Sequence, residues 1–110
     1  MVKYVPDKGD IVWIDFEPQK GREIKKVRPA VVISPYSYNF KSNLALFLPI
    51  TSQIKGYPFE VIINYDQIKG TILCDQIRSM DWKERKVANI TKLDKHLLNQ
   101  VISKLKLLLI

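Results

Sequence analysis

"KKVRPAVVISPYSYN", residues 25–39, joins three basic side chains to a run of apolar residues. The apolar run predicts a buried strand from about Pro29 to Ser34. Arg28 and the rigid Pro29 come immediately before it. An arginine at the start of a buried strand is held more firmly than one in a flexible tail, which is useful where an anion must be bound. This stretch therefore predicts a core strand with an anion-binding end.

The preceding segment, "GDIVWIDFEP", predicts another strand, from about Ile11 to Glu17. Its residues alternate between apolar and mixed character, so one face should lie in the core and the other should form a binding surface. The core set is Val12, Ile14 and Phe16, and the second face carries Ile11, Trp13, Asp15 and Glu17.

Further short strands are expected at about 44–50, 59–64, 71–80 and 87–90, with a helical turn in "PYSYNF", residues 35–40. Gly, Pro, Asn and Ser separate these segments. Short strands at this spacing favour a small β-barrel.

The last segment, "TKLDKHLLNQVISKLKLLLI", changes to helical spacing. Thr91 is the expected N-cap, and Asp94 three residues later makes a loose capping box. The apolar stripe predicts a helix that packs on the barrel. A helix lying on a membrane surface is the alternative, and it is less favoured because a barrel of this size needs a cover. The stripe comprises Leu93, Leu97, Val101, Leu105 and Leu108, widened by Leu98, Ile102 and Leu109.

The chain of 110 residues is expected to form a single domain over 1–110, because 46% hydrophobic residues suffice for one core. Cys74 is the single cysteine, so no internal disulfide is possible and a reducing, cytoplasmic compartment is expected. The first ten residues lack the apolar stretch of a signal peptide. We expect no membrane association.

The formal net charge is +7, which suggests an anionic partner such as nucleic acid, an acidic protein or a lipid surface. The segment "KGREIKKVR", residues 20–28, carries five basic residues and one acid, Glu23. The positive charge is therefore a local feature.

No metal or cofactor motif is present in the sequence. It has no HExxH, paired cysteines, Walker A or GxGxxG pattern, and Cys74 and His96 are the only soft metal ligands. Cys74 is expected to be a small core residue and His96 a helix-surface residue. We therefore expect no metal and no cofactor.

The remaining candidates for chemistry suit an anionic substrate. An arginine offers a planar fork of donors to phosphate oxygens, a threonine hydroxyl can donate to the same anion, and a glutamate among cations stays ionised and can accept a proton. This set suits the binding of a phosphodiester and is compatible with its cleavage. The candidates are Arg28, Glu23, Thr51, Ser52, Gln53 and Asp75.

Three stretches carry a resemblance to a known family. They are "GDIVWIDFEPQKGREIKKVRPAVVISP" (9–35), "LPITSQIKGYPFEV" (48–61) and "CDQIRSMDW" (74–82). In order and spacing they resemble the MazF/PemK family of toxin endoribonucleases. The resemblance implies a small SH3-like barrel with a C-terminal α-helix, acting as a homodimer. It also implies a toxin of a type II toxin–antitoxin system that cleaves single-stranded RNA, mostly mRNA, at short sequence motifs. Cleavage would need no metal and would leave 2′,3′-cyclic phosphate and 5′-hydroxyl ends.

The resemblance also implies roles for single residues. Arg28 matches the family's catalytic arginine and Thr51 its catalytic threonine, while Glu23 corresponds to the acidic residue of the basic loop and is the candidate general base. Asp75 and Gln76 match a motif that contacts bases or positions Arg28. The general acid stays open, because this chain has Arg22 and Leu73 where some members have a histidine and an arginine.

RNA binding is expected to combine backbone attraction with stacking and base contacts. An antitoxin with an acidic, disordered tail is the implied partner and would compete for the same surface. Two alternatives stay open: a toxin of the same fold that acts on DNA gyrase, and a non-catalytic nucleic-acid-binding regulator. The expected RNA-binding residues are Lys20, Arg22, Lys25, Lys26, Ser52, Gln53, Tyr57, Asp75, Gln76 and Trp13.

Overall fold

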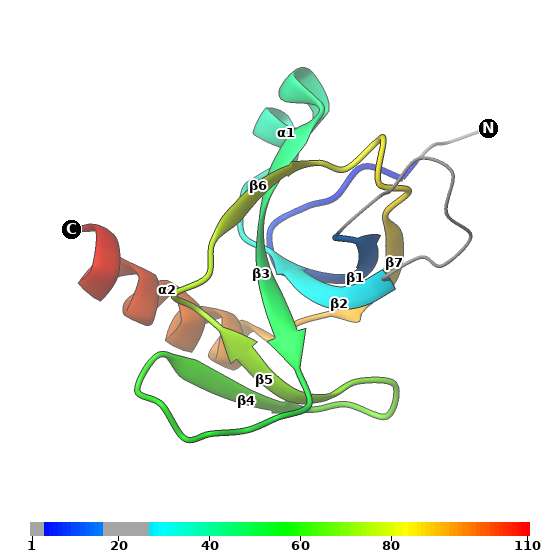
Figure 1. The fold of residues 1–110 in the computed structure, drawn as a ribbon. Coiled ribbons are helices and arrows are strands. Elements are labelled where there is room, and N and C mark those ends of the chain that lie inside the picture. Colours follow the sequence, from blue (N-terminus) through cyan, green and yellow to red (C-terminus); the bar gives the residue numbers. More distant parts are fainter. Residues whose placement is uncertain (1–3, 17–26) are drawn as a thin grey trace.

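A computed structural model describes residues 4–16 and 27–110 of the chain (Figure 1). Its centre is a seven-stranded antiparallel sheet in the order β4-β5-β3-β2-β1-β7, with β6 paired to β3. The expectation of a mainly β fold, a small barrel-like sheet with a C-terminal helix, is confirmed. The strands are β1 (Asp10–Asp15), β2 (Val27–Val32), β3 (Leu44–Thr51), β4 (Glu60–Asn64), β5 (Lys69–Leu73), β6 (Arg78–Asp81) and β7 (Ala88–Lys92), and the helices are α1 (Tyr36–Ser42) and α2 (Lys95–Leu109).

The long strand β3 holds the curled sheet together. Its first half pairs with β6, its middle pairs with β2, and its last two residues, Ile50 and Thr51, pair with β5. Each half of β3 thus belongs to a different part of the sheet. The sheet curls around it into a half-barrel, and α2 lies against one side (Figure 1).

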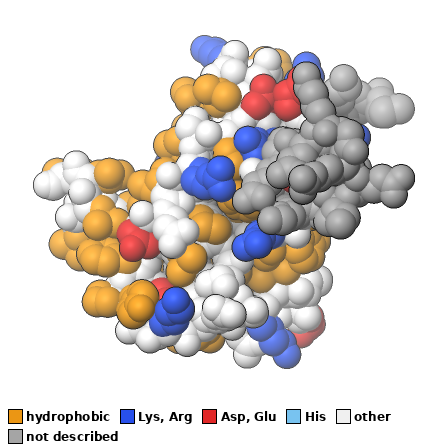
Figure 2. Space-filling view, in the orientation of Figure 1, with side chains coloured by type: hydrophobic (Ala, Val, Ile, Leu, Met, Phe, Trp, Pro, Cys, Tyr) orange, Lys and Arg blue, Asp and Glu red, His pale blue; other side chains and the backbone are white. Residues whose placement is uncertain are grey.

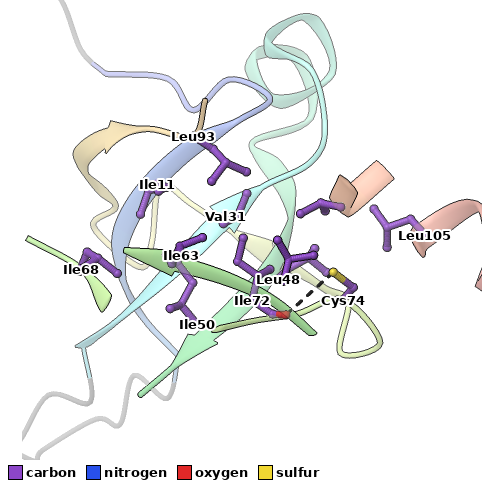
Figure 3. Close-up of a cluster of buried hydrophobic side chains, with 12 residues drawn as sticks. Ile11, Val31, Leu48, Ile50, Ile63, Ile68, Ile72, Cys74, Leu93 and Leu105 are labelled. Carbon is purple, nitrogen blue, oxygen red and sulfur yellow. Dashed lines mark hydrogen bonds between the residues drawn. The ribbon is translucent and has the colours of Figure 1, made fainter. Parts of the chain in front are cut away.

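Two groups of buried side chains pack on opposite faces of the sheet. The helix-side core includes Ile11, Val31 and Leu48, and it reaches α2 through Val101 and Leu105 (Figure 3). Burying one such aliphatic side chain contributes roughly 1.5–3 kcal/mol. The second group, which we call the barrel core, comprises Val12, Ile14, Phe16, Ala30, Val32, Ala45, Phe47, Met80 and Trp82.

Both faces of the sheet are covered by buried side chains. This explains the apolar residues of β2 and corrects the expectation that Ile11 of β1 is exposed. Ala30 and Val32 lie in the barrel core and Val31 in the helix-side core, so the last three residues of β2 form a continuous apolar run. Ile11 was expected on an exposed face, but it is fully buried because the helix-side core covers that face. Trp13 on the same face is 39% exposed.

The expected strand over 71–80 is wrong as one element. The chain turns after Leu73, where the amide of Gln76 donates to the Leu73 carbonyl at 3.2 Å. β5 pairs with β4 and the end of β3, whereas β6 pairs with the first half of β3. One straight strand cannot meet both ends of β3. The turn places Asp75 and Gln76 outside the sheet.

The N-cap of α2 is Asp94 and not Thr91. The Asp94 carboxylate accepts from the amide of Leu97 at 2.9 Å, whereas Thr91 belongs to β7 and pairs with Ile11. The Tyr65 hydroxyl also donates to Asp94, at 3.2 Å. The helix begins later than expected because β7 continues along β1 through Lys92.

The apolar stripe of α2 covers the sheet over most of its length. Val101 and Leu105 are buried, as expected. Leu108 and Leu109, which the stripe also included, are exposed because the helix runs past the edge of the sheet (Figure 1). In residues 4–16 and 27–110 no helix is long and apolar enough to cross a membrane.

Candidate active site

Arg28 and Thr51 lie at the same end of the β2–β3 ladder. The pairs of this ladder run from Val32–Phe47 to Ala30–Pro49. Arg28 is two residues beyond Ala30 on β2, and Thr51 is two residues beyond Pro49 on β3. The strands are antiparallel, so both residues extend past the same last pair.

The alternation of side chains also assigns both residues to one face of the sheet. Ala30 on β2 and Phe47 on β3 point into the barrel core. Because every second residue shares a face, Arg28 and Thr51 belong to this same face. Arg28 is exposed and Thr51 is half-buried. A guanidinium and a hydroxyl from distant segments therefore occupy one side of one strand end.

Local hydrogen bonding orients the Thr51 hydroxyl. Its Oγ1 accepts from the amide of Gln53 at 3.2 Å. A hydroxyl that accepts in this way keeps its own O–H for another acceptor. Thr51 can therefore donate a hydrogen bond to an anion beside the strand end.

A cavity of about 280 Å³ adjoins Thr51. It lies between the loop after β3 and the turn that follows β5. The structure thus brings together expected site residues from two separate segments of the chain. The expected site residues that line it are Thr51, Gln53, Tyr57, Asp75 and Gln76.

Other expected site residues lie elsewhere. Trp13 is paired with Pro29, the neighbour of Arg28, and so belongs to the opposite face of the sheet. Ser52 is exposed beside Thr51 and does not line the cavity. Glu23, Lys20, Arg22, Lys25 and Lys26 lie outside the described residues.

Arg78, which was not expected from the sequence, lies on the same face of the sheet as Arg28 and Thr51. It pairs with Phe47, and its side chain shares a face with Met80 of the barrel core. Its guanidinium lies 5.3 Å from the centre of the Phe16 ring, which makes a cation–π contact. Figure 2 shows Lys and Arg side chains over the region of β2, β3 and β6. Arg78 lies two residues before the apolar Met80, and this spacing could have indicated that the two share a face of one strand. Because one long strand was expected over 71–80, β6 was not considered by itself.

Cys74 has the surroundings of a core residue. It is fully buried, and its thiol lies 3.9 Å from the Ile72 carbonyl, to which it donates (Figure 3). Burial raises the pKa of the Cys74 thiol to about 11. A thiol with so high a pKa is a poor nucleophile.

Within the described ranges, no group of three His, Cys, Asp or Glu residues suits a metal ion.

Comparisons with known proteins bear on the whole chain. A family model described as "PemK-like, MazF-like toxin of type II toxin-antitoxin system" matches residues 7–109. A protein of Escherichia coli strain K12 named "Endoribonuclease toxin MazF" is 49% identical over 83 residues, covering 76% of this chain and 75% of that protein.

Solved structures are similar as well. A crystal structure of MazF from Deinococcus radiodurans has a TM-score of 0.86 and 42% identity, covering 97% of this chain and 98% of the other. A MazE–MazF crystal structure from the same organism gives a TM-score of 0.87 at 41% identity, covering 96% of this chain and 97% of the other.

The curled sheet, its covering helix and the match over nearly the whole chain define a toxin of a type II toxin–antitoxin system. This chain belongs to the PemK-like, MazF-like toxin family. The resemblance noted in the sequence is thereby confirmed.

Proposed function

We propose that this chain, an endoribonuclease of the MazF-like family, cleaves single-stranded mRNA at short sequence motifs without a metal ion. The observation that carries this proposal is the position of Arg28 and Thr51 on one face, at one end of the β2–β3 ladder. An arginine and a hydroxyl on one face of a strand end are suited to holding one phosphodiester group.

In the proposed reaction the substrate supplies the nucleophile. The ribose 2′-oxygen attacks the adjacent phosphorus, the new P–O2′ bond forms, and the P–O5′ bond breaks. The products are a 2′,3′-cyclic phosphate and a 5′-hydroxyl. One proton leaves the 2′-hydroxyl and one is delivered to the departing 5′-oxygen.

Each side chain has a definite task in this reaction. The guanidinium of Arg28 binds the non-bridging oxygens and stabilises the negative charge that grows on them. The hydroxyl of Thr51, whose Oγ1 already accepts from Gln53, donates to one of these oxygens. Glu23 is the general base, a role that rests on the family resemblance because it lies outside the described residues.

Single-stranded RNA suits this chemistry for two reasons. In-line attack needs a backbone free of A-form geometry, and unpaired bases expose their edges. The basic residues Lys20, Arg22, Lys25 and Lys26 would attract the RNA backbone. Base contacts are assigned to Ser52, Gln53, Tyr57, Asp75 and Gln76, with Trp13 as a further stacking surface.

The proposed partners are an antitoxin and a second copy of the chain, in the cytoplasm. A relative was crystallised as a MazE–MazF complex, and an acidic, disordered tail would complement a net charge of +7. For the homodimer, the support is the exposed apolar end of α2, where Leu107 is 78% and Ile110 97% exposed. Apolar side chains gathered in this way are typical of interfaces.

Cleavage is tested with purified protein and single-stranded RNA in excess EDTA. Wild type should give fragments at fixed positions, and a 2′-deoxy nucleotide at the cut should abolish them. Arg28→Ala and Thr51→Ala should each lower the rate about a hundred- to a thousandfold, because each removes one oriented donor. Lys83→Ala, an exposed cation far along the chain from both, is the matched control.

Intact RNA from wild type would contradict the nuclease. RNA binding without cleavage would favour a non-catalytic regulator, and inhibition of DNA gyrase would favour the toxin of the same fold.

For the dimer, Leu107→Lys should shift the sedimentation of the protein to that of a monomer. Ile62→Lys, at another exposed apolar position, should leave it unchanged.

A further inference from the structure

The cavity beside Thr51 has an unusual charge for this protein. Two carboxylates, Glu60 and Asp75, line it against one cation, Lys55. The chain as a whole carries a formal charge of +7. A phosphate group would be repelled by this lining and drawn to the arginines of the neighbouring strand ends. The cavity therefore suits an uncharged part of the substrate.

Part of the cavity wall is apolar or aromatic. Phe59 and Leu73 contribute hydrocarbon surface, and Tyr57 adds an exposed ring. The volume of about 280 Å³ lies just below the ~300–1,000 Å³ of sites for drug-sized ligands. A single planar ring system bound by stacking fits such walls.

Hydrogen bonds within the chain hold these walls in place. The amide of Glu60 donates to the Tyr57 carbonyl at 3.1 Å, and the amide of Gly56 donates to Glu60 Oε1 at 3.0 Å. The amide of Cys74 donates to the Phe59 carbonyl at 3.0 Å. Lys104 of α2 donates to the carbonyl of Pro58, which ties the loop to the helix. The shape of the cavity is thus set by contacts between its own segments and α2.

A carboxylate in such a cavity favours a ligand that carries a hydrogen-bond donor. An ionised carboxylate only accepts hydrogen bonds, and it offers about four acceptor sites, so Glu60 can serve both Gly56 and a ligand. Adenine, cytosine and guanine carry an exocyclic amino group, which donates. At the position of the cytosine amino group uracil has a carbonyl oxygen, which would face the carboxylates acceptor to acceptor.

We infer that this cavity binds an amino-bearing base on one of the two nucleotides that flank the scissile phosphate, with Glu60 and Asp75 accepting from the amino group. Thr51 is part of the cavity wall and of the proposed phosphate site, which sets the base next to the cleaved bond. The inference rests on the proposed function and adds to it a specificity determinant, Glu60, that the sequence did not point to.

The test uses the full chain and RNA oligonucleotides that contain one mapped cleavage site. At each flanking position the amino group is removed or replaced: cytidine by uridine, adenosine by purine riboside, guanosine by inosine. At one of the two positions this should lower kcat/KM about ten- to a hundredfold. Changes three or more nucleotides away should have a smaller effect.

Variants then connect the preference to the cavity. Glu60→Gln keeps the oxygen that accepts from Gly56 and adds a donor, and Asp75→Asn does the same for its own side chain. Each should shrink the ratio of kcat/KM between the amino and non-amino substrates. Asp66→Asn removes the same charge from an exposed turn and should leave the ratio unchanged.

The outcomes separate this inference from the function on which it rests. Cleavage that is indifferent to the amino group at both positions would overturn the inference alone. A preference that survives unchanged in Glu60→Gln and Asp75→Asn would also overturn it. If wild type cuts none of the oligonucleotides, the proposed function fails and the inference fails with it.

Discussion

Gly70 lies directly against the carbonyl group of Thr51. A Cβ atom placed on Gly70 would lie 2.2 Å from the Thr51 carbonyl oxygen and 2.9 Å from its carbon. The φ angle of Gly70 is +152°, which also favours glycine. No side chain fits between the two backbones. Because Gly70 has none, β5 can approach Thr51 closely and help to hold it in position.

We predict that Gly70→Ala lowers kcat for RNA cleavage about tenfold or more while KM changes less. The added methyl group must displace the Thr51 backbone, and a small misplacement of a reacting group is costly. In the Gly70→Ala background, Thr51→Ala should cost much less than it does in wild type, because the two changes disturb one interaction. Steady-state kinetics of the four proteins measure this.

Gly56→Ala is the control for backbone strain. Gly56 also has a positive φ, +78°, but a Cβ there would meet nothing within 4 Å. It should keep a kcat near that of wild type. Equal loss in both glycine variants, or full additivity with Thr51→Ala, would contradict the role of Gly70.

Arg78 should contribute to binding of the RNA backbone. Its guanidinium sits over the Phe16 ring on the same face as Thr51. We predict that Arg78→Ala weakens binding of a 2′-deoxy-blocked RNA and lowers the slope of log affinity against log salt by about 1, since one phosphate contact is lost. Phe16→Leu should produce a smaller change in the same direction.

Lys83→Ala removes a cation from the turn after β6 and should leave the salt slope as in wild type. Binding by titration at four or more salt concentrations gives all the slopes. An unchanged slope in Arg78→Ala would show that this arginine makes no phosphate contact.

Asp94→Ala should destabilise the protein by about 1 kcal/mol, a typical value for loss of an N-cap. The carboxylate accepts from the Leu97 amide and from Tyr65, and both bonds are lost. Urea unfolding followed by circular dichroism measures the change. Asp66→Ala, at an exposed turn, should stay within about 0.5 kcal/mol of wild type. The same loss in both variants would argue against the cap.

Because the Cys74 thiol is buried, we predict that the free energy of unfolding declines at alkaline pH. Its pKa is raised from 9.0 to about 11 by burial, so folding favours the protonated thiol. The resulting stabilisation is complete below about pH 9 and is lost as pH rises through the folded pKa near 11. The free energy of unfolding of wild type minus that of Cys74→Ala should therefore be constant below this window and fall within it.

The comparison of wild type with Cys74→Ala removes other titrations from the result. Tyr4, whose pKa is also raised by burial and by its hydrogen bond to Asp10, titrates in both proteins. Urea unfolding at a series of pH values gives the difference. A difference that stays level through pH 11 would contradict the prediction.

Local patterns in the sequence were sufficient for most of the fold. The alternation in β1 identified Val12, Ile14 and Phe16 as core, and the helical spacing of the last segment identified Val101 and Leu105. These predictions succeeded because side-chain direction within one strand or helix follows from its own period. The resemblance to toxin sequences also pointed to Arg28 and Thr51 as candidates.

Long-range pairing decided what these patterns missed. Ile11 is buried because the helix-side core, built from several strands and α2, covers a face of β1 that its own pattern could not reveal. The turn after Leu73 exists because β5 and β6 pair with different halves of β3. The periodicity of side chains within one strand does not show which other strand will pair with it.

By itself the sequence determined most of the segments that become strands and helix and which side chains are candidates for phosphate chemistry. Only the tertiary structure set Arg28 and Thr51 at one strand end, brought Arg78 to their face, and placed Glu60 and Asp75 around one cavity. The physical reason is the curl of the sheet. Closing β3 against both β2 and β5 juxtaposes residues that lie dozens of positions apart, and the geometry of that closure depends on every strand at once.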